Sequence, residues 1–524
     1  MKHSKINGLA EAVTLENKLH VIVQAGGRGS RLRHHTWNKP KCLVAVNGKP
    51  VLYHLFDRFP HAKFVIIGDY LFEQLKTYLE VNPPCVEFAL LETSEKGTSS
   101  GVADALQIIP NSSPVLLAWS DLIIKKTPEF PCSENPVIFT TNAFTCRWTV
   151  NKSGEFHEIP SDINGIPGLF YSARAEQFPI PPKEGEFVKW FSKLDQKFEV
   201  LACNDIEEIG DFSKVETGND REGFCRFFNS VEIDTLKNQV IKRVIDPAYD
   251  CVHKDEINWY EQATKLGFRR IPKVFGSSPL TMERICGIHL YNATDFTQRE
   301  QRAVISNYLD ALISLHDLGK EPSSDLDLRR VYIEKTRTRV ESVSALIPML
   351  DRETVTVNGQ KCRNFFTDRH SHIFDKLQSV LRSDWFVPTH GDPTFSNSIV
   401  DDNLRVWFID PRGSFAKPGI FGDAWYDFAK VYYSAVGGYD FFNRRKFKLH
   451  VDDGTVEVLM ETPIFADVSN EIFNDYFNKD LPRIKLLHGL IWLALSGYVK
   501  DDIDSIIGSF YLGLYWLEDG LRNL

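Results

Sequence analysis

Short apolar runs alternate with helical patterns over residues 20–125. The runs are HVIVQA, KFVIIG, VEFALLE and PVLLAWSD, and their apolar character is typical of strands that are buried on both faces. The intervening segments PVLYHLFDRF and YLFEQLKTYLEV carry apolar residues at helical spacing. This alternation predicts an α/β fold in which helices cover both faces of a parallel sheet.

The pattern changes near residue 222. Two segments, FCRFFNSVEI and NQVIKRV, indicate antiparallel strands, and they are followed by a predicted helix at 254–266 and a strand near PLTMERI. After residue 300 the pattern is mostly helical, with a turn-rich segment at 385–423. The second half is therefore predicted to be a separate α+β domain.

Chain length supports this division, because 524 residues are too many for one hydrophobic core. We predict an N-terminal domain at 1–221 and a C-terminal domain at 222–524. The C-terminal domain is expected to have a smaller lobe over 222–287 and a larger lobe over 288–524.

The composition is that of a soluble globular protein, with 43% hydrophobic and 25% charged residues and a net charge of −9. The acidic balance argues against nucleic-acid binding. The most apolar late segments are too short to span a bilayer, and the N-terminus lacks the apolar core of a signal peptide. Nine scattered cysteines without a C-x-x-C pair favour free thiols and a cytoplasmic location. The oligomeric state is left open.

A glycine-rich, cationic stretch, VQAGGRGSRLRHHTWNKPKC, follows the first predicted strand. Glycine lets the backbone approach a ligand closely and direct consecutive N–H groups at one anion. The stretch adds cations at the edge of the sheet where α/β folds bind ligands. Neither a G-x-x-x-x-G-K-[ST] loop nor a complete G-x-G-x-x-G motif is present. We therefore expect a polyphosphate here, bound with the help of Arg28, Arg31, Lys39 and Lys41.

The string AGGRGSRL…T…KPKCLVAVNGKPVL resembles the signature of nucleotidyltransferases that activate sugar 1-phosphates, phosphocholine and similar phosphate esters. The resemblance covers residues 20–218 and implies a Rossmann-like nucleotidyltransferase domain. It implies that Arg31 neutralises β- and γ-phosphate charge and that Lys41 contacts the α-phosphate or the incoming phosphate. The glycines that would hold the NTP triphosphate are Gly26, Gly27 and Gly29.

Two later stretches extend this resemblance. In EKGTSSGVADAL, Gly97, Thr98 and Ser99 match small residues that contact the base or the acceptor. The apolar strand in LLAWSDLII ends on Asp121, which matches an aspartate that binds Mg²⁺. A second acidic metal ligand is expected within NDIEEIGDFSKVE. Three residues compete for that role: Glu208, Asp205 and Asp211.

In the second half, PTHGDPTFSNSIV…RVWFIDPRGSF…FGDAWYDFAKVYYS resembles the aminoglycoside-phosphotransferase and choline-kinase superfamily. The resemblance covers residues 223–524 and implies a bilobal protein-kinase-like fold. It implies that Asp392 orients and deprotonates the substrate hydroxyl, that Asn397 binds Mg²⁺, and that Asp410 bridges Mg²⁺ to the phosphates. Asp423 and Asp427 match a structural segment that braces this loop.

The smaller lobe carries the expected nucleotide-binding residues. Lys242 lies in the middle of a strand, and the resemblance assigns it to the α- and β-phosphates of ATP. Its expected partner on the next helix is Glu256, or alternatively Glu261. Adenine is expected to contact the backbone from Glu283 to Ile285. No glycine-rich phosphate loop precedes the lysine.

Together the two halves predict a bifunctional enzyme. A kinase would phosphorylate a small hydroxyl compound with ATP. A Mg²⁺-dependent nucleotidyltransferase would then combine the phosphate ester with a second NTP, CTP by preference, to make an activated donor for surface polysaccharide. One alternative is an anomeric sugar kinase joined to a sugar-1-phosphate nucleotidyltransferase. Another is that one half is a non-catalytic regulatory or scaffolding module.

The hydroxyl compound is left open between choline or ethanolamine, a polyol and a sugar. Choline would need an aromatic cage that attracts its cation, although core packing is the alternative role for the same rings. The residues concerned are Trp425, Tyr426, Tyr432 and Tyr433.

Overall fold

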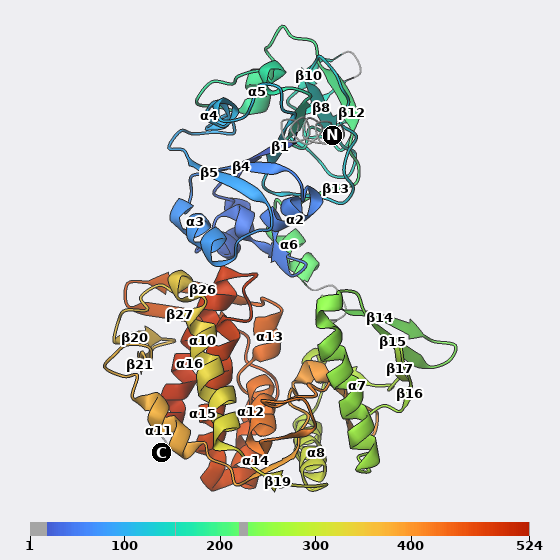
Figure 1. Cartoon of the computed structure of the whole chain (residues 1–524), viewed down its shortest axis with the longest axis vertical. Helices are drawn as coiled ribbons and strands as arrows, with labels where there is room; N and C mark the ends of the chain where they lie inside the picture. The colour runs from blue at the N-terminus through green and yellow to red at the C-terminus, as the bar shows by residue number, and fades with distance from the viewer. Residues whose placement is uncertain (1–17, 152–153, 220–228, 523–524) are drawn as a thin grey trace, which may run out of the picture. The chain divides into compact units, whose positions relative to one another are not determined.

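The computed structural model describes residues 18–151, 154–219 and 229–522. The chain divides into two compact units (Figure 1). Unit 1 comprises residues 1–220 with 501–503, and unit 2 comprises 221–500 with 504–524. The predicted boundary between residues 221 and 222 lies outside the described residues.

Unit 1 is built on a seven-stranded sheet with the order β12-β8-β11-β6-β1-β4-β5. The strands are β1 (His20–Gln24), β4 (Lys63–Gly68), β5 (Glu87–Glu92), β6 (Val115–Trp119), β8 (Val137–Thr140), β11 (Leu169–Ser172) and β12 (Glu199–Ala202). Only β11 of this sheet runs against its neighbours, β6 and β8. The predicted α/β fold with a predominantly parallel sheet is thus confirmed for the N-terminal unit.

The inner strands of this sheet are apolar because they are covered on both faces, whereas the edge strands β5 and β12 are partly exposed. Ile22, Leu117 and Ile138 pack with Phe170 and Phe187 in one buried cluster. The helices are α2 (Val51–Arg58), α3 (Phe72–Val81), α4 (Val102–Gln107), α5 (Phe187–Phe191) and α6 (Phe212–Asn219), with 3-10 turns η1 (Ser30–Thr36), η2 (Lys41–Leu43) and η3 (Ala175–Gln177). Short strands complete the unit: β2 (Ala45–Val46), β3 (Lys49–Pro50), β7 (Leu122–Ile124), β9 (Thr149–Val150), β10 (Phe156–His157) and β13 (Ile206–Glu208).

Unit 2 begins with a four-stranded antiparallel sheet of order β14-β15-β17-β16. Its strands are β14 (Asn229–Asp234), β15 (Gln239–Val244), β16 (Val274–Ser277) and β17 (Leu280–Glu283). The predicted helix at 254–266 is α7 (Asp250–Lys265), which begins earlier because the 3-10 turn η4 (Pro247–Tyr249) leads directly into it.

The remainder of unit 2 is dominated by helices, among which α15 packs between α10 and α12 (Figure 1). These helices are α8 (Gln298–His316), α9 (Asp325–Arg329), α10 (Lys335–Glu341), α11 (Ile373–Val380), α12 (Ala424–Ala435), α13 (Tyr439–Asn443), α14 (Ala466–Phe477), α15 (Leu481–Ser496) and α16 (Ile503–Arg522). None of the helices in the described ranges has the length and apolarity needed to cross a bilayer.

The mostly helical prediction for this region missed a four-stranded sheet of order β21-β20-β27-β26. Its strands are β20 (Thr354–Val357), β21 (Gln360–Arg363), β26 (Phe447–Asp452) and β27 (Thr455–Met460). One hairpin turns at Asn358-Gly359, where both residues have positive φ, and the other contains Asp453-Gly454. Asn-Gly and Asp-Gly between alternating strands are the hairpin signals that would have revealed this sheet.

Two three-stranded sheets complete unit 2, with orders β18-β23-β24 and β19-β22-β25. Four of their strands, β22 to β25, lie in the segment 385–423 that was predicted to be rich in turns, and β18 and β19 come from earlier in the chain. The strands are β18 (Ile288–His289), β19 (Glu321–Pro322), β22 (Trp385–Pro388), β23 (Ser398–Val400), β24 (Val406–Phe408) and β25 (Phe421–Gly422).

Candidate functional site

The glycine loop of unit 1 follows β1 and packs closely against the segment that carries Lys41. Gly29 has a φ of +64°, and an added Cβ there would lie 3.1 Å from Cβ of Lys41 and 3.2 Å from Cγ2 of Thr36. A Cβ on Gly27 would meet no atom within 4 Å. The loop is therefore closed on the lysine side and leaves backbone accessible at Gly27.

Lys41 and Asp121 form an ion pair beside this loop. Lys41 begins η2 and Asp121 follows β6, and both side chains are 13% exposed. The second carboxylate oxygen of Asp121, Oδ1, is buried and has no hydrogen-bond partner. Leaving a buried carboxylate oxygen without a partner is unfavourable, so the site suits an additional cation.

The pairing of β13 with β7 brings Glu208 next to Asp121. Glu208 lies opposite Leu122, and the N–H of Ile209 donates to the Asp121 carbonyl at 2.7 Å. The Glu208 carboxylate contacts Nζ of Lys214 at 3.1 Å. Its other oxygen lies 3.6 Å from Nη2 of Arg31.

The two alternative acids lie elsewhere. Asp211 accepts hydrogen bonds from Ser213 and from the N–H of Lys214 at the start of α6, and these bonds lower the pKa of its carboxyl. Asp205 precedes β13, where its carbonyl accepts from the Lys125 N–H at 2.7 Å. Glu208 is therefore the one of the three whose strand position adjoins Asp121.

The Gly97–Ser99 segment is fixed by contacts to two other loops. Gly97 has a φ of +101°, and an added Cβ would lie 2.3 Å from the carbonyl oxygen of Gly185. The Thr98 hydroxyl accepts from the N–H of Phe187 at 2.8 Å, and its carbonyl accepts from Nε2 of Gln24 at 3.0 Å. Because the Thr98 hydroxyl already accepts a hydrogen bond, it is less available to a ligand than the backbone of this segment.

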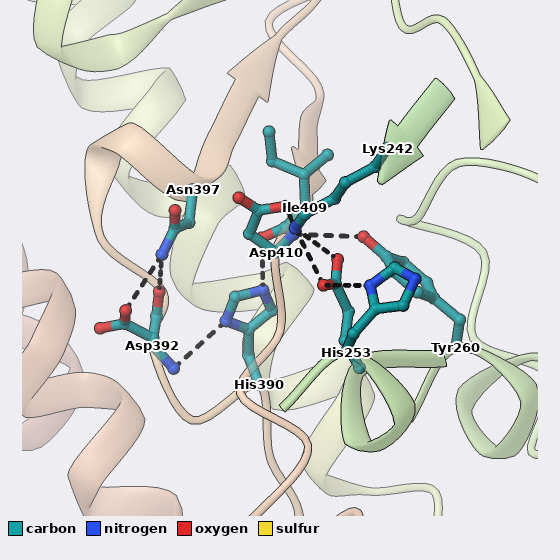
Figure 2. Close-up of polar contacts among 9 residues, drawn as sticks. Lys242, His253, Tyr260, His390, Asp392, Asn397, Ile409 and Asp410 are labelled. Atoms are coloured by element: carbon teal, nitrogen blue, oxygen red, sulfur yellow. Dashed lines mark hydrogen bonds and ion pairs between the residues drawn. The ribbon is translucent and has the colours of Figure 1, made fainter. Parts of the chain in front are cut away.

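In unit 2, Lys242 joins three elements. Its Nζ lies 2.9 Å from both carboxylate oxygens of Glu256 on α7 and 2.8 Å from Oδ1 of Asp410. Figure 2 shows the lysine reaching from its strand toward Asp410. Burial lowers the pKa of Lys242, but the two carboxylates outweigh burial and raise the pKa above its ordinary value. The lysine is therefore held charged, with Glu256 rather than Glu261 as its partner.

Asp410 is held in an uncommon backbone conformation. Its φ is +54°, in the left-handed region that residues other than glycine rarely adopt. Its N–H donates to the hydroxyl of Tyr260 at 3.2 Å (Figure 2). Close packing of the following Gly413, whose added Cβ would lie 2.3 Å from the Asp255 carbonyl oxygen, keeps this loop against α7. Such strain gathers at functional sites.

Asp392 and Asn397 lie side by side (Figure 2). Nδ2 of Asn397 donates to the Asp392 carbonyl at 2.9 Å and to Oδ2 of its carboxylate at 3.2 Å. Nζ of Lys430 lies 2.9 Å from Oδ1 of Asp392. Sequence reasoning missed Lys430, which occurs 38 positions after Asp392 and outside the H-G-D motif.

His390 connects the two acidic segments. Its Nε2 donates to the Ile409 carbonyl at 3.0 Å, and its Nδ1 accepts from the Asp392 N–H at 3.3 Å. Burial lowers its pKa, which favours this neutral form. The carboxylate of the fully buried Asp427 accepts hydrogen bonds from the backbone N–H groups of His390 and Gly391, each at 2.8 Å.

The expected adenine segment begins at Glu283, the last residue of β17. The N–H of Glu283 donates to the Lys273 carbonyl at 2.8 Å. A contribution of Glu283 to adenine would therefore come from its carbonyl oxygen, and a donor would have to come from a later residue such as Ile285.

Both units can contribute ligands to Mg²⁺, but neither forms a complete cage. In the described residues, no group of three or more His, Cys, Asp and Glu side chains could hold a metal ion alone. The pair Asp121 and Glu208, and the pair Asp410 and Asn397, are the side chains that could supply oxygen ligands. This donor set fits Mg²⁺, which takes one or two carboxylates and completes its shell with water and substrate phosphates.

Comparison with known proteins identifies the N-terminal region. Residues 21–127 match the family model of the MobA-like NTP transferase domain. Unit 1 thus contains an N-terminal MobA-like NTP transferase domain.

The curated relatives match over a short stretch. The bifunctional protein GlmU of Marinobacter nauticus is 32% identical over 107 residues, which are 20% of this chain and 22% of that protein. Its counterpart in Burkholderia mallei is 29% identical over 112 residues, 21% of this chain and 23% of that protein. The chain therefore spans less than one quarter of the length of these relatives.

Two solved structures align with 38% of this chain and 97% of their own. HddC from Yersinia pseudotuberculosis is 17% identical with a TM-score of 0.31. The CTP:phosphocholine cytidylyltransferase LicC from Streptococcus pneumoniae is 19% identical with a TM-score of 0.31.

Proposed function

We propose that this chain is a bifunctional enzyme with a kinase in unit 2 and a nucleotidyltransferase in unit 1. The kinase phosphorylates a small hydroxyl compound with ATP. The nucleotidyltransferase joins the resulting phosphate ester to the nucleotidyl group of an NTP, CTP by preference, and yields an activated donor for surface polysaccharide. The observation that carries the proposal is the Lys41–Asp121 pair beside the glycine loop, within the region that matches the NTP transferase model.

In the nucleotidyltransferase, a phosphate-ester oxygen attacks the α-phosphorus of the NTP. The bond from that phosphorus to the oxygen bridging to the β-phosphate breaks, and pyrophosphate leaves. Both reactants are anionic, so Lys41 and Arg31 act by offsetting negative charge, and no general base is required. Mg²⁺ held by Asp121 and Glu208 would supply further charge compensation.

In the kinase, the acceptor hydroxyl oxygen attacks the γ-phosphorus of ATP. Its proton passes to the Asp392 carboxylate, the bond from the γ-phosphorus to the β–γ bridging oxygen breaks, and ADP leaves. Lys242 binds the α- and β-phosphates, oriented by Glu256. Asn397 and Asp410 would hold Mg²⁺ on the phosphates. Lys430 and Asn397 fix the orientation of the Asp392 carboxylate.

The overall proposal is tested by identifying products. Full-length protein is incubated with ATP, with CTP, UTP or GTP, and with a panel of hydroxyl compounds, and nucleotide-linked products are identified by mass. A product that requires both ATP and a second NTP supports two consecutive reactions. Failure of every combination, and of every preformed phosphate ester, would contradict the proposal.

Asp121→Asn is expected to raise the Mg²⁺ concentration needed for half-maximal pyrophosphate release by roughly tenfold or more, since a neutral amide is a poorer ligand for a hard cation. Asp205→Asn is the matched control, because Asp205 lies at the other end of β13. Wild-type Mg²⁺ dependence in Asp121→Asn would remove Asp121 from the metal site.

Lys242→Met is expected to abolish phosphorylation and to destabilise unit 2 by about 3–5 kcal/mol, because it leaves the buried carboxylate of Glu256 without its cation. Lys242 and Glu256 are 4% and 5% exposed. The double variant Lys242→Met/Glu256→Gln should recover part of the lost thermal stability without recovering activity. Kinase activity in Lys242→Met would refute its phosphate-binding role.

A further inference from the structure

Cationic side chains from separate elements gather near Tyr426, and one of them also contacts Asp392. Lys430 on α12 pairs with Asp392, and its ammonium lies 6.0 Å from the ring centroid of Tyr426. The ammonium of Lys335, the first residue of α10, lies 5.5 Å from the same centroid. One aromatic ring next to the proposed catalytic carboxylate thus faces two lysines.

Arg412 adds a further cation from the loop after β24. The backbone N–H of Arg412 donates to the carbonyl oxygen of His390 at 3.0 Å. A Cβ added to Gly391 would lie 2.9 Å from the Cβ of Arg412. The backbone and Cβ of this arginine therefore lie directly against the H-G-D segment.

The pKa values of this cluster reflect its crowded positive charge. Burial raises the pKa of Tyr426, yet Lys335, Lys430 and Arg412 outweigh burial and lower that pKa to about 8. Burial is the largest cause that lowers the pKa of Lys335, and together with Arg412, Arg339 and Lys430, and against the opposing effect of Tyr426, it brings that pKa to about 8.

The carboxylates nearest in sequence do not neutralise this charge. Glu334 pairs with Arg329, and Asp327 pairs with Lys417. Within the described part of unit 2, no carboxylate lies within ion-pair distance of Lys335 or Arg412.

Asp440 on α13 is another acid near Asp392. Burial raises the pKa of its carboxyl to about 6, while Ser434 and Arg444 favour its charged form. The charged and titratable groups that affect the pKa of Lys335 most are Tyr426 and three cations. Lys335 and Arg412 lie close enough to each other and to Lys430 to affect the pKa of Lys335, and neither has an ion-paired carboxylate of its own. This is unfavourable, and a bound anion would relieve it.

The same contacts argue against an aromatic cage for choline. The ammonium of Lys430 lies 5.1 Å from the ring centroid of Tyr433, and the guanidinium of Arg483 lies 5.1 Å from that of Trp425. These rings, with Tyr426, already face cations of the protein. A quaternary ammonium placed there would be repelled.

We propose that the acceptor phosphorylated by unit 2 carries an anionic group, a carboxylate or a phosphate, in addition to its hydroxyl. The anionic group binds Lys335 and Arg412 while the hydroxyl lies at Asp392. This inference rests on the proposed kinase function and narrows its substrate class. The phosphoryl transfer is the one written above, with ADP as the leaving group and Asp392 as the proton acceptor.

The test compares acceptors that differ in charge on one carbon skeleton. Full-length protein is assayed for ADP formation with Mg²⁺-ATP and glycerol, glycerate or glycerol 3-phosphate, and with the pairs ethylene glycol and glycolate, and glucose and gluconate. Ethanolamine and choline are tested as cationic acceptors. We expect kcat/KM of the best anionic acceptor to exceed that of its neutral partner by about 10–100-fold, the effect of one or two charge-assisted contacts. Glycerate and glycerol 3-phosphate separate carboxylate from phosphate.

Variants connect this preference to the cluster. Lys335→Gln and Arg412→Gln should each raise KM for the anionic acceptor by about tenfold with a smaller change in kcat, as expected for lost binding. Lys335→Arg should retain most of the affinity. Lys417→Gln is the control, because that lysine is 71% exposed and pairs with Asp327.

Binding gives a second measurement that does not need turnover. The anionic compounds should raise the melting temperature of the wild-type protein, and Lys335→Gln should remove that increase without lowering the melting temperature of the ligand-free protein. A neutral or cationic acceptor preferred by the wild type, with an unchanged KM in both Gln variants, would overturn the inference and leave the kinase standing. If the wild type neither phosphorylates any acceptor nor is stabilised by Mg²⁺-ATP, the proposed kinase fails and the inference with it.

Discussion

Asp392→Asn is expected to stop conversion of the free hydroxyl compound into its nucleotide-linked product, with a loss in kinase rate of roughly 10²–10⁴-fold. Asparagine can still bond the hydroxyl, but it cannot accept the proton. It also removes the negative charge that Lys430 pairs with at 2.9 Å. The measurement is ADP formation together with mass detection of the final product.

The decisive part of this experiment is rescue. Supplying the phosphate ester directly should restore the nucleotide-linked product in Asp392→Asn, because the N-terminal site needs only that ester, an NTP and Mg²⁺. Asp402→Asn, an exposed acid a few residues beyond Asn397, is the control and should behave as wild type. Phosphorylation by Asp392→Asn would refute the assignment of the H-G-D aspartate. Loss of phosphorylation without rescue by any ester would refute the transfer of an intermediate between the two reactions.

Lys41→Ala is expected to lower nucleotidyl transfer by about 10²–10³-fold, because one lost charge-assisted contact at the α-phosphate costs about 3–4 kcal/mol of transition-state stabilisation. Kinase activity should remain near the wild-type value. The two rates are measured separately, as pyrophosphate release with preformed ester and as ADP formation without a second NTP.

Two further variants make this result specific. Lys49→Ala removes an exposed lysine of the same segment, paired with Asp57, and should leave both rates unchanged. Lys41→Arg keeps the charge beside Asp121 and should retain more nucleotidyl transfer than Lys41→Ala. An equal loss of both activities in Lys41→Ala would indicate misfolding or a shared site, and would contradict two separate sites.

Hydrophobic patterning predicted most of unit 1, because its central strands are buried on both faces and carry a strong local signal. It did not predict the reversal of β11, since strand direction depends on connections and neighbours rather than on side-chain pattern. In unit 2, the sheet that contains β20 and β27 was missed because its two hairpins lie far apart in the chain. Only their Asn-Gly and Asp-Gly turns gave a local signal.

The candidate site was also predicted partly from the sequence and partly only from the tertiary structure. The glycines after β1, the aspartate after β6 and the H-G-D motif are determined by the sequence alone, because local residue types and spacing carry their chemistry. The choice of Glu208 over Asp205 and Asp211 depended on strand pairing with β7. The choice of Glu256 over Glu261 depended on which face of α7 meets Lys242.

The cationic cluster was decided by tertiary structure alone. Lys335, Arg412 and Lys430 belong to three different elements. The sequence around each of them does not distinguish it from an ordinary lysine or arginine on the protein surface. The fold brings all three close enough to Tyr426 to affect the pKa of this tyrosine, and it places Lys430 on Asp392 as well. The sequence therefore determined the motifs from which the two reactions are proposed. The proposed charge of the acceptor depends on long-range packing, because electrostatic energy depends on distances in space and not on distances along the chain.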